Sequence, residues 1–291
     1  MTEYTPSERN PYFLNPEDGA ELARLLRLDQ FTTQAMGGPL VEQPDPAAFS
    51  SVLDLACGPG GWVLDVAYTY PDVEVAGIDI SRAMIDFANA RAQTQGLTNA
   101  SFGVMDVTGP LDFSDHSFDL VNGRFLIGFL SKAGWPELIR ECTRILRPGG
   151  ILRLTETDWL GPTNSPAFER LSALSAQLYT RLPGERSFSP DGRTYGITPM
   201  LTGFLREAGY HHISYRAHAI DFSAGTQGWS DVYRNAEVVF QLIKGQLIAQ
   251  ELTTEEEFRQ LFQQMQIDAY SHDFRAIWYF LTVWGERPSD A

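Results

Sequence analysis

Residues 51–62, SVLDLACGPGGW, place an acid inside an apolar run and follow it with three glycines in four positions. Apolar residues on both sides of Asp54 are typical of a buried parallel strand. Glycines directly after a strand permit a tight turn and let a ligand approach the backbone closely. The next apolar residues recur at helical spacing, at Trp62, Val63, Val66 and Ala67. The stretch therefore predicts a strand, a glycine loop and a helix whose N-terminal amides face a ligand.

Downstream of this unit, strand and helix patterns alternate. Strands are predicted at 73–80, 100–107, 118–125 and 151–159, and helices at 81–96 and 135–150, the second ended by Pro148-Gly149-Gly150. Such alternation indicates an α/β fold with a doubly wound, mostly parallel sheet and helices on both faces. Ligands of such sheets bind at the carboxyl ends of the strands.

The segments outside this alternation predict an elaborated domain. Residues 1–48 are expected to form an N-terminal helical cap segment that ends in a Pro- and Asp-rich linker, and 49–291 the main domain. Beyond residue 160 we expect helices at 165–181 and 198–208, a strand at 213–222, two helices within 229–268 and a last strand at 273–285. The helical pair at 229–268 is longer than a plain connection requires. It is predicted to be a lid.

The composition limits the classes of partner. A net charge of −15 without any basic run argues against a nucleic-acid partner, because phosphate binding needs clustered Lys and Arg. The apolar stretch 276–284 is too short to span a bilayer, and the polar N-terminus does not resemble a signal peptide. Two cysteines, Cys57 and Cys142, form no disulfide framework. We therefore expect a cytoplasmic protein, either a monomer or a homodimer.

Three acids, Asp54, Asp79 and Asp106, occur once per strand–helix unit. Each lies near the carboxyl end of its strand, so all three are expected to face one crevice. A purely structural role is the alternative for Asp79, which precedes the helix-capping Ser81, and for Asp106. For Asp54, inside an apolar run, such a role is harder to find.

Two ligand classes use a glycine loop together with an acid after the second strand. Dinucleotide enzymes carry G-x-G-x-x-G, but here Trp62 and Val63 stand where the third glycine is expected. The third acid, Asp106, could accept a hydrogen bond from an adenine amino group. Together these features disfavour a nicotinamide oxidoreductase without excluding it.

The motifs VLDLACGPGGW, VAGIDISRAMIDFA, VMDV, FDLVNGRF and ILRPGGIL, within about residues 50–160, resemble the successive motifs of class I S-adenosylmethionine-dependent methyltransferases. The variant is similar to the ubiquinone/menaquinone-biosynthesis type and to small-molecule methyltransferases. The resemblance implies a Rossmann-like seven-stranded sheet, with the last strand antiparallel between the fifth and sixth. It also implies S-adenosyl-L-methionine as cofactor.

The same resemblance implies roles for single residues. Asp54 and the backbone of the glycine loop would hold the methionine portion, and Asp79 would accept both ribose hydroxyls. Ile80 and Met84 would sandwich the adenine, with Asp106 and Val107 at its edge. The full set expected to bind the cofactor is Tyr12, Gln30, Asp54, Ala56, Cys57, Gly58, Gly60, Asp79, Ile80, Met84, Met105, Asp106, Val107, Asn122, Gly123 and Arg124.

The reaction expected is methyl transfer to O, C or N of a small acceptor, with an apolar or aromatic molecule favoured by the aromatic residues after 159. Candidate substrate residues are Phe125, Asp158, Trp159, Trp229 and Tyr233. A general base is unknown; His272 is the candidate, because it begins the last strand, and a capping role is its alternative. No metal site is expected. A scaffold that binds the cofactor without turnover also remains open.

Overall fold

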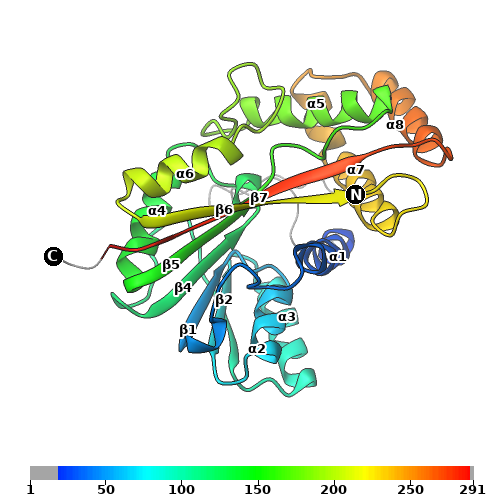
Figure 1. Ribbon diagram of the computed structural model, residues 1–291. Helices are drawn as coiled ribbons and strands as arrows, with labels where there is room; N and C mark the ends of the chain where they lie inside the picture. Colours follow the sequence, from blue (N-terminus) through cyan, green and yellow to red (C-terminus); the bar gives the residue numbers. More distant parts are fainter. Residues whose placement is uncertain (1–18, 289–291) are drawn as a thin grey trace.

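The computed structural model describes residues 19–288, which contain one seven-stranded sheet in the order β3-β2-β1-β4-β5-β7-β6 (Figure 1). All neighbouring strands are parallel except β7, which is antiparallel to β5 and β6. The predicted fold and the position of the last strand are confirmed. The strands are β1 (Ser51–Leu55), β2 (Glu74–Asp79), β3 (Ala100–Val104), β4 (Phe118–Arg124), β5 (Leu146–Glu156), β6 (His211–Asp221) and β7 (Ile277–Glu286).

Helices cover both faces of the sheet and one of its ends. α1, α2 and α3 lie on one face, α4 and α6 on the other, and α5, α7 and α8 pack together beyond the carboxyl ends of the parallel strands (Figure 1). The α-helices are α1 (Gly19–Met36), α2 (Gly61–Thr69), α3 (Arg82–Gln95), α4 (Gly134–Ile145), α5 (Pro166–Arg181), α6 (Thr198–Glu207), α7 (Trp229–Ala249) and α8 (Glu255–Ala269). Two short 3₁₀ helices are η1 (Pro46–Ala48) and η2 (Leu126–Gly128).

The first strand–loop–helix unit forms as the sequence predicts. β1 buries Val52, Leu53 and Leu55, because strands on both sides and helices on both faces enclose it. α2 then begins at Gly61, with Gly60 as its N-cap in the left-handed region at φ 75°. Burial of each aliphatic side chain contributes roughly 1.5–3 kcal/mol, which fixes the loop between two rigid elements.

Several predicted boundaries are wrong by three residues or more, including the ends of β3, at Val104 rather than 107, and of β5, at Glu156 rather than 159. The helix predicted to end at Pro148-Gly149-Gly150 ends at Ile145, and these residues belong to β5. Leu146 pairs with Phe118 across an irregular register, and Gly149 takes the turn at φ 76°. The last strand begins at Ile277 rather than 273. The assignment of residues 1–48 as a cap stays a prediction.

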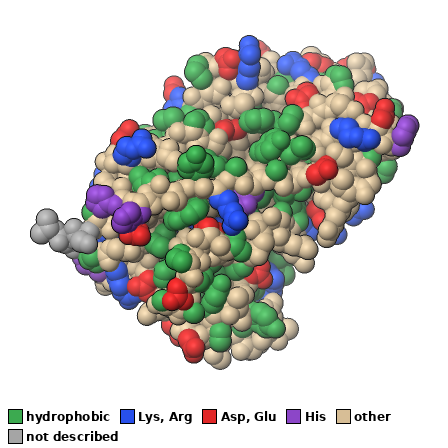
Figure 2. All heavy atoms as spheres, in the orientation of Figure 1, with side chains coloured by type: hydrophobic (Ala, Val, Ile, Leu, Met, Phe, Trp, Pro, Cys, Tyr) green, Lys and Arg blue, Asp and Glu red, His purple; other side chains and the backbone are tan. Residues whose placement is uncertain are grey.

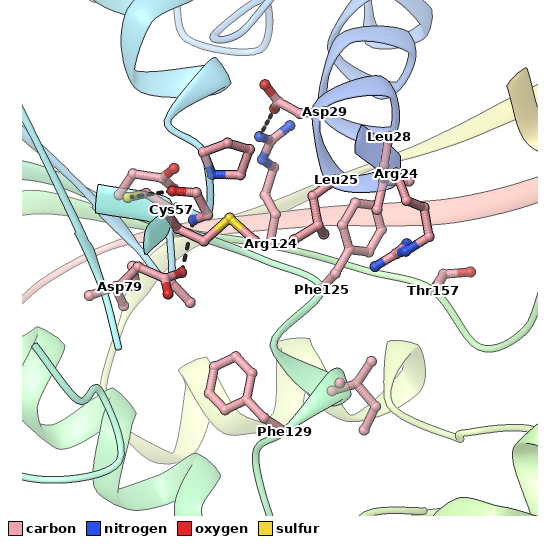
Figure 3. Close-up of a pocket in the computed structure, with 18 of the residues that line it drawn as sticks. Arg24, Leu25, Leu28, Asp29, Cys57, Asp79, Arg124, Phe125, Phe129 and Thr157 are labelled. Atoms are coloured by element: carbon pink, nitrogen blue, oxygen red, sulfur yellow. Dashed lines mark hydrogen bonds and ion pairs between the residues drawn. The ribbon is translucent and has the colours of Figure 1, made fainter. Parts of the chain in front are cut away.

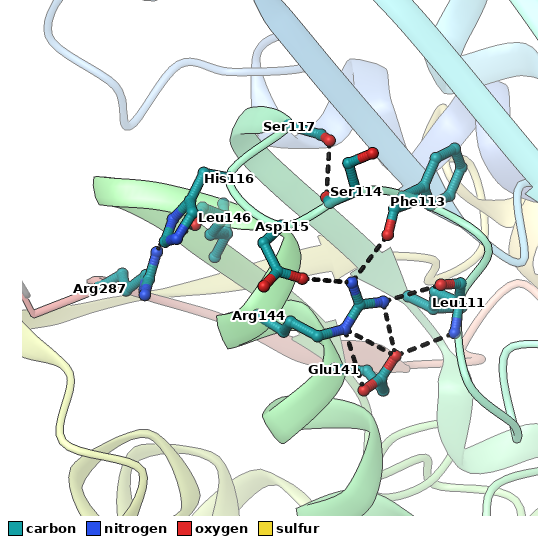
Figure 4. A network of polar contacts seen from close by, with 10 residues as sticks. All are labelled: Leu111, Phe113, Ser114, Asp115, His116, Ser117, Glu141, Arg144, Leu146 and Arg287. Atoms are coloured by element: carbon teal, nitrogen blue, oxygen red, sulfur yellow. Dashed lines mark hydrogen bonds and ion pairs between the residues drawn. The ribbon is translucent and has the colours of Figure 1, made fainter.

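The edge of the sheet opposite to the strand carboxyl ends is fixed by one arginine (Figure 4). Arg144 on α4 donates to the backbone oxygens of Leu111 and Phe113 at 2.8 and 2.7 Å, and to Asp115 at 2.8 Å. It also pairs with Glu141, which accepts a hydrogen bond from the Leu111 amide. The Arg144 guanidinium holds the pKa of the Asp115 and Glu141 carboxyls below their usual range. The loop before β4 is thus held to α4.

The surface shows no gathering of basic side chains on the face seen in Figure 2, where Lys and Arg are dispersed among acidic and apolar groups. Within residues 19–288, none of the helices has the length and apolar character needed to cross a membrane.

Candidate active site

A cavity opens at the carboxyl ends of β1, β2, β4 and β5 and continues beneath α1 and α7. Its first part is bounded by the glycine loop and the strand-end acids. Its second part is bounded by aromatic and aliphatic side chains. The wall consists of Arg24, Leu25, Leu28, Asp29, Asp54, Leu55, Ala56, Cys57, Gly58, Pro59, Asp79, Ile80, Met84, Met105, Asp106, Val107, Arg124, Phe125, Ile127, Gly128, Phe129, Thr157, Trp159, Leu160, Tyr179, Tyr195, Asn235, Val239 and Trp278.

The glycine loop is shaped by Asp79. Its Oδ2 accepts a hydrogen bond from the Gly58 amide at 2.9 Å, and its Oδ1 accepts one from the Ser81 amide at 2.9 Å. Gly58 has φ 53°, and a Cβ built there would meet nothing within 4 Å. The positive φ favours glycine, and the open space above it lets a ligand reach the backbone. Burial raises the pKa of Asp79, while the two amides oppose that rise.

Asp54 lies at the base of the cavity and is the last member of a hydrogen-bonded chain of buried polar side chains. Asn122 Nδ2 donates to Asp54 Oδ1 at 2.7 Å, and Asn122 Oδ1 accepts from Arg153 Nη1 at 2.6 Å. Arg153 is fully buried in β5 and pairs with Glu42 from the linker after α1. Burial raises the pKa of Asp54 from 3.8 to about 7, although Arg124 and Asn122 act against this rise.

α1 is tied to the sheet by an ion pair across the cavity. Asp29 accepts a hydrogen bond from Arg124 at the end of β4, and Arg124 also donates to Thr33 Oγ1 at 3.1 Å. Figure 3 shows Asp29 pointing to Arg124, with Arg24 reaching from the same helix toward the cavity. A Cβ at Gly61 would overlap the Asp29 carboxylate, so α1 approaches the start of α2 closely. The ion pair is mostly buried, so water and salt screen it weakly.

The second part of the cavity has aromatic walls. Phe125 stacks on Trp278 with ring centroids 5.9 Å apart, and Tyr179 packs on Tyr195 at 4.4 Å. Phe125 has a positive φ of 56° and is the N-cap of η2. Two buried bonds fix this bend, because Glu156 accepts hydrogen bonds from the Leu126 amide at 2.6 Å and the Ile127 amide at 3.4 Å.

Many residues predicted from the sequence lie in the cavity wall. They are Asp54, Ala56, Cys57, Gly58, Asp79, Ile80, Met84, Met105, Asp106, Val107, Arg124, Phe125 and Trp159. Their contacts with a cofactor or substrate stay predictions.

Several other predicted cofactor residues lie outside the wall. Gly60 faces the Phe102 ring, which a Cβ would approach to 2.6 Å, so this glycine serves helix packing. Asn122 lies beneath Asp54, and a Cβ at Gly123 would meet Leu126 at 2.8 Å. Gln30 is exposed on α1, because the wall is formed by the other side of that helix. Tyr12 falls outside the described residues.

The remaining substrate and base candidates also lie elsewhere. Asp158 is buried and accepts a hydrogen bond from the Ile197 amide at 2.7 Å, which satisfies the start of α6. Trp229 donates to the Ala269 carbonyl and stacks on Tyr233, so both residues join α7 to α8. His272 is exposed in the turn before β7 and is not part of the wall.

Sequence reasoning missed Arg24, Asn235, Arg153, Glu42 and Glu156. A signal existed for Arg153 and Glu156, since each is a charged residue inside the apolar pattern of 151–159. Arg24 and Asn235 gave none, because their meeting depends on how α1 and α7 pack. Residues 19–288 contain no group of three or more His, Cys, Asp or Glu placed to hold a metal ion.

The raised pKa of Asp54 predicts a stability change for Asp54→Asn. In the folded state the Asp54 carboxyl stays protonated up to about pH 7, whereas in the unfolded state it loses its proton near pH 4. The free energy of unfolding that this group contributes is therefore lost as the pH rises from about 4 to about 7. We expect the variant to gain up to about 4 kcal/mol over the wild type at pH 8 and almost nothing at pH 4. Urea unfolding at both pH values measures this, with exposed Asp86→Asn as control. A pH-independent difference contradicts the raised pKa.

The chain matches known proteins over the region that forms this site. Residues 52–150 match the family described as methyltransferase domain. A demethylmenaquinone methyltransferase of Lactococcus lactis is 28% identical over 58% of this chain and 68% of its own length. A protein-methionine methyltransferase, LaeA, of Emericella nidulans is 33% identical over 54% of this chain. The alignments span 39% to 57% of the fungal relatives.

The solved structure of the YcgJ protein from Bacillus subtilis has the same fold, with a TM-score of 0.55 and 16% identity over 88% of this chain and 99% of its own. The Lactococcus lactis relative and some fungal relatives are named as methyltransferases, whereas other fungal relatives are named as regulators of secondary metabolism. The nicotinamide alternative finds no support among these relatives. Residues 52–150 therefore carry a methyltransferase domain, for which S-adenosylmethionine is the cofactor, and the chain is similar to class I S-adenosylmethionine-dependent methyltransferases.

Proposed function

We propose that this chain moves a methyl group from S-adenosylmethionine to O, C or N of a small apolar or aromatic acceptor. The observation that carries the proposal is one continuous cavity, which runs from the strand-end acids to aromatic walls under α1 and α7. The two relatives are named for different acceptors, demethylmenaquinone and a protein methionine, so the acceptor class rests on the cavity itself.

The residues present fit the cofactor. The space above Gly58 is open, and a side chain at this position would occupy the room that the cofactor needs. Each carboxylate oxygen of Asp79 accepts one hydrogen bond from a backbone amide, so each keeps a lone pair that can accept a hydrogen bond from a ribose hydroxyl. Ile80, Met84 and Val107 supply apolar surface for an adenine ring. Asp54 would lie beside the methionine portion and Asp106 beside the adenine edge.

The cofactor supplies an activated methyl group on a sulfonium, and the chain has to align the acceptor with it and exclude water. Well-oriented reactants reach effective molarities of about 10⁵–10⁸ M, so alignment alone is a large contribution. Phe125, Trp278 and Tyr195 would hold the acceptor ring. α1 and α7 would exclude water from above.

We infer that the acceptor ionises without a histidine base. The described wall contains no histidine, and Asp29 is engaged with Arg124. A phenol or an enol would lose its proton to solvent before the transfer, whereas a neutral amine would attack through its lone pair and lose a proton to solvent afterwards.

The direct test is turnover. Incubation with methyl-labelled S-adenosylmethionine and a panel of phenols, quinols and amines should transfer label to at least one apolar member. Calorimetry with S-adenosylhomocysteine and with NAD accompanies it. Binding of S-adenosylhomocysteine with no transfer to any acceptor class would favour the scaffold reading, and binding of NAD alone would overturn the proposal.

Asp79→Asn should weaken binding of S-adenosylhomocysteine about tenfold to a hundredfold, because charge-assisted bonds to the ribose hydroxyls are lost. Calorimetry gives the dissociation constant. Asp86→Asn, which removes an exposed charge on the neighbouring helix, should leave it unchanged. An unaltered constant in Asp79→Asn removes this residue from ribose binding.

Gly58→Val should abolish cofactor binding, whereas Gly96→Val should only destabilise the fold. Both glycines have positive φ, 53° and 69°, and open space around a Cβ, but only Gly58 lines the cavity. Valine at either position should therefore cause a similar backbone strain of about 1–3 kcal/mol. Thermal unfolding should show that both variants lose a similar amount of stability, and calorimetry with S-adenosylhomocysteine should show that only Gly58→Val loses cofactor binding. Equal cofactor binding by both variants would show that the loop acts only as a turn.

Cofactor binding should slow hydrogen exchange in α1 and α7, because Asp29–Arg124 and Arg24–Asn235 hold these helices over the cavity and a bound cofactor would stabilise that arrangement. Mass spectrometry of residues 19–36 and 229–249, with and without S-adenosylhomocysteine, measures this. Protection confined to 54–61, 79–84 and 104–107 would contradict a lid formed by these helices.

A further inference from the structure

Asn235 of α7 presents an amide of fixed orientation to the second part of the cavity. The residue lines the cavity and is 6% exposed. Its Oδ1 accepts a hydrogen bond from Arg24 Nη1 at 2.9 Å. A guanidinium carries donors only, so the amide oxygen must face Arg24. The amide nitrogen therefore faces away from Arg24.

Arg24 is itself held in place. Its Nε and Nη2 donate to the two carboxylate oxygens of Glu21, each at 2.7 Å, and Glu21 is completely buried. Such a bidentate pair fixes the plane of the guanidinium. Because Arg24 cannot rotate freely, the amide of Asn235 is held in one orientation as well.

The amide nitrogen of Asn235 donates no hydrogen bond within residues 19–288, and it is not one of the fully buried polar atoms without a partner, so it keeps access to the open space of the cavity. Neighbouring polar groups in the wall already have partners. Thr157 accepts from Trp278 Nε1 at 2.9 Å and contacts the Tyr279 carbonyl at 2.8 Å, and the Tyr195 hydroxyl contacts Ser175 at 3.0 Å. An N–H group that borders the cavity can donate to an acceptor atom of a bound ligand, and it would lose its access to water without such a partner once the ligand fills the cavity.

The surroundings favour a neutral oxygen. Val239 lies one turn further along α7, and Phe125 and Trp278 supply apolar surface in the same wall. Among residues 19–288, the wall contains two cations, Arg24 and Arg124, which are paired with Glu21 and Asp29. A carboxylate ligand would add an unbalanced charge to this buried region, whereas a carbonyl oxygen accepts the N–H group at little cost.

We propose that Asn235 determines acceptor specificity by donating to a neutral carbonyl-type oxygen on an otherwise apolar acceptor. The inference rests on the proposed function, because it concerns the acceptor end of the same cavity. It narrows the acceptor from any apolar molecule to one that carries such an oxygen away from the methylated atom.

The test uses two probes with the same bicyclic body, 1-tetralone with a carbonyl and tetralin without one. Equilibrium dialysis measures the affinity of each for the full chain saturated with S-adenosylhomocysteine. We expect the wild type to bind 1-tetralone about tenfold more tightly than tetralin. Equal affinities, or no binding of either probe, would overturn the inference.

Three variants separate the donor from the packing. Asn235→Leu and Asn235→Asp should both lose the preference for 1-tetralone, and Asp keeps the contact with Arg24 while lacking the N–H group. Asn89→Leu on α3, outside the cavity, should keep the preference. A preference retained in Asn235→Asp would overturn the role of the amide. Binding of S-adenosylhomocysteine is followed separately, so its absence in the wild type contradicts the proposed function rather than this inference.

Discussion

The hydrogen-bond chain Glu42–Arg153–Asn122–Asp54 is the constraint on which the site depends. This chain places charged side chains in the centre of the sheet, where a carboxylate or a guanidinium without a partner would be severely destabilising. Because each member is held by the next, the Asp54 carboxylate keeps one position at the base of the cavity. The linker that supplies Glu42 directly follows α1. The base of the cavity and its cover are therefore joined through one short segment.

A second ion pair, Asp29–Arg124, links the cover of the cavity to the sheet. Asp29–Arg124 ties α1 to the end of β4, next to the bend at Phe125 that starts the acceptor wall. The buried Glu156 holds that bend from below through two backbone amides, and burial keeps its pKa well above the ordinary value. Cofactor end and acceptor end thus share a rigid boundary at β4. A shift of α1 would change both ends together.

The sequence was sufficient for the parts of the molecule governed by local pattern. The apolar runs of the sequence predicted the strands β1 to β5. The position of Asp54, Asp79 and Asp106 at one end of the sheet could be predicted because each acid follows or ends a strand, and parallel strands end on the same side. The acceptor end could not be predicted in this way. Trp229 and Tyr233 are aromatic and lie on the expected helix, yet they face α8, and Asn235, in the same helix, faces the cavity. Helical periodicity gives a buried face but does not say which neighbour buries it.

The buried acids show why residue type alone misleads about role. Asp79, Asp158 and Glu156 are all strand-end carboxylates that accept backbone amides, but only Asp79 also borders the cavity. Asp158 accepts a hydrogen bond from a backbone amide at the start of α6, and every helix N-terminus has such amides without a partner inside the helix. A carboxylate at this edge can therefore serve a ligand only where its remaining lone pairs face open space. By that criterion we infer that Asp79 and Asp54 define the cofactor end, and that an amide, Asn235, rather than an acid defines the acceptor end.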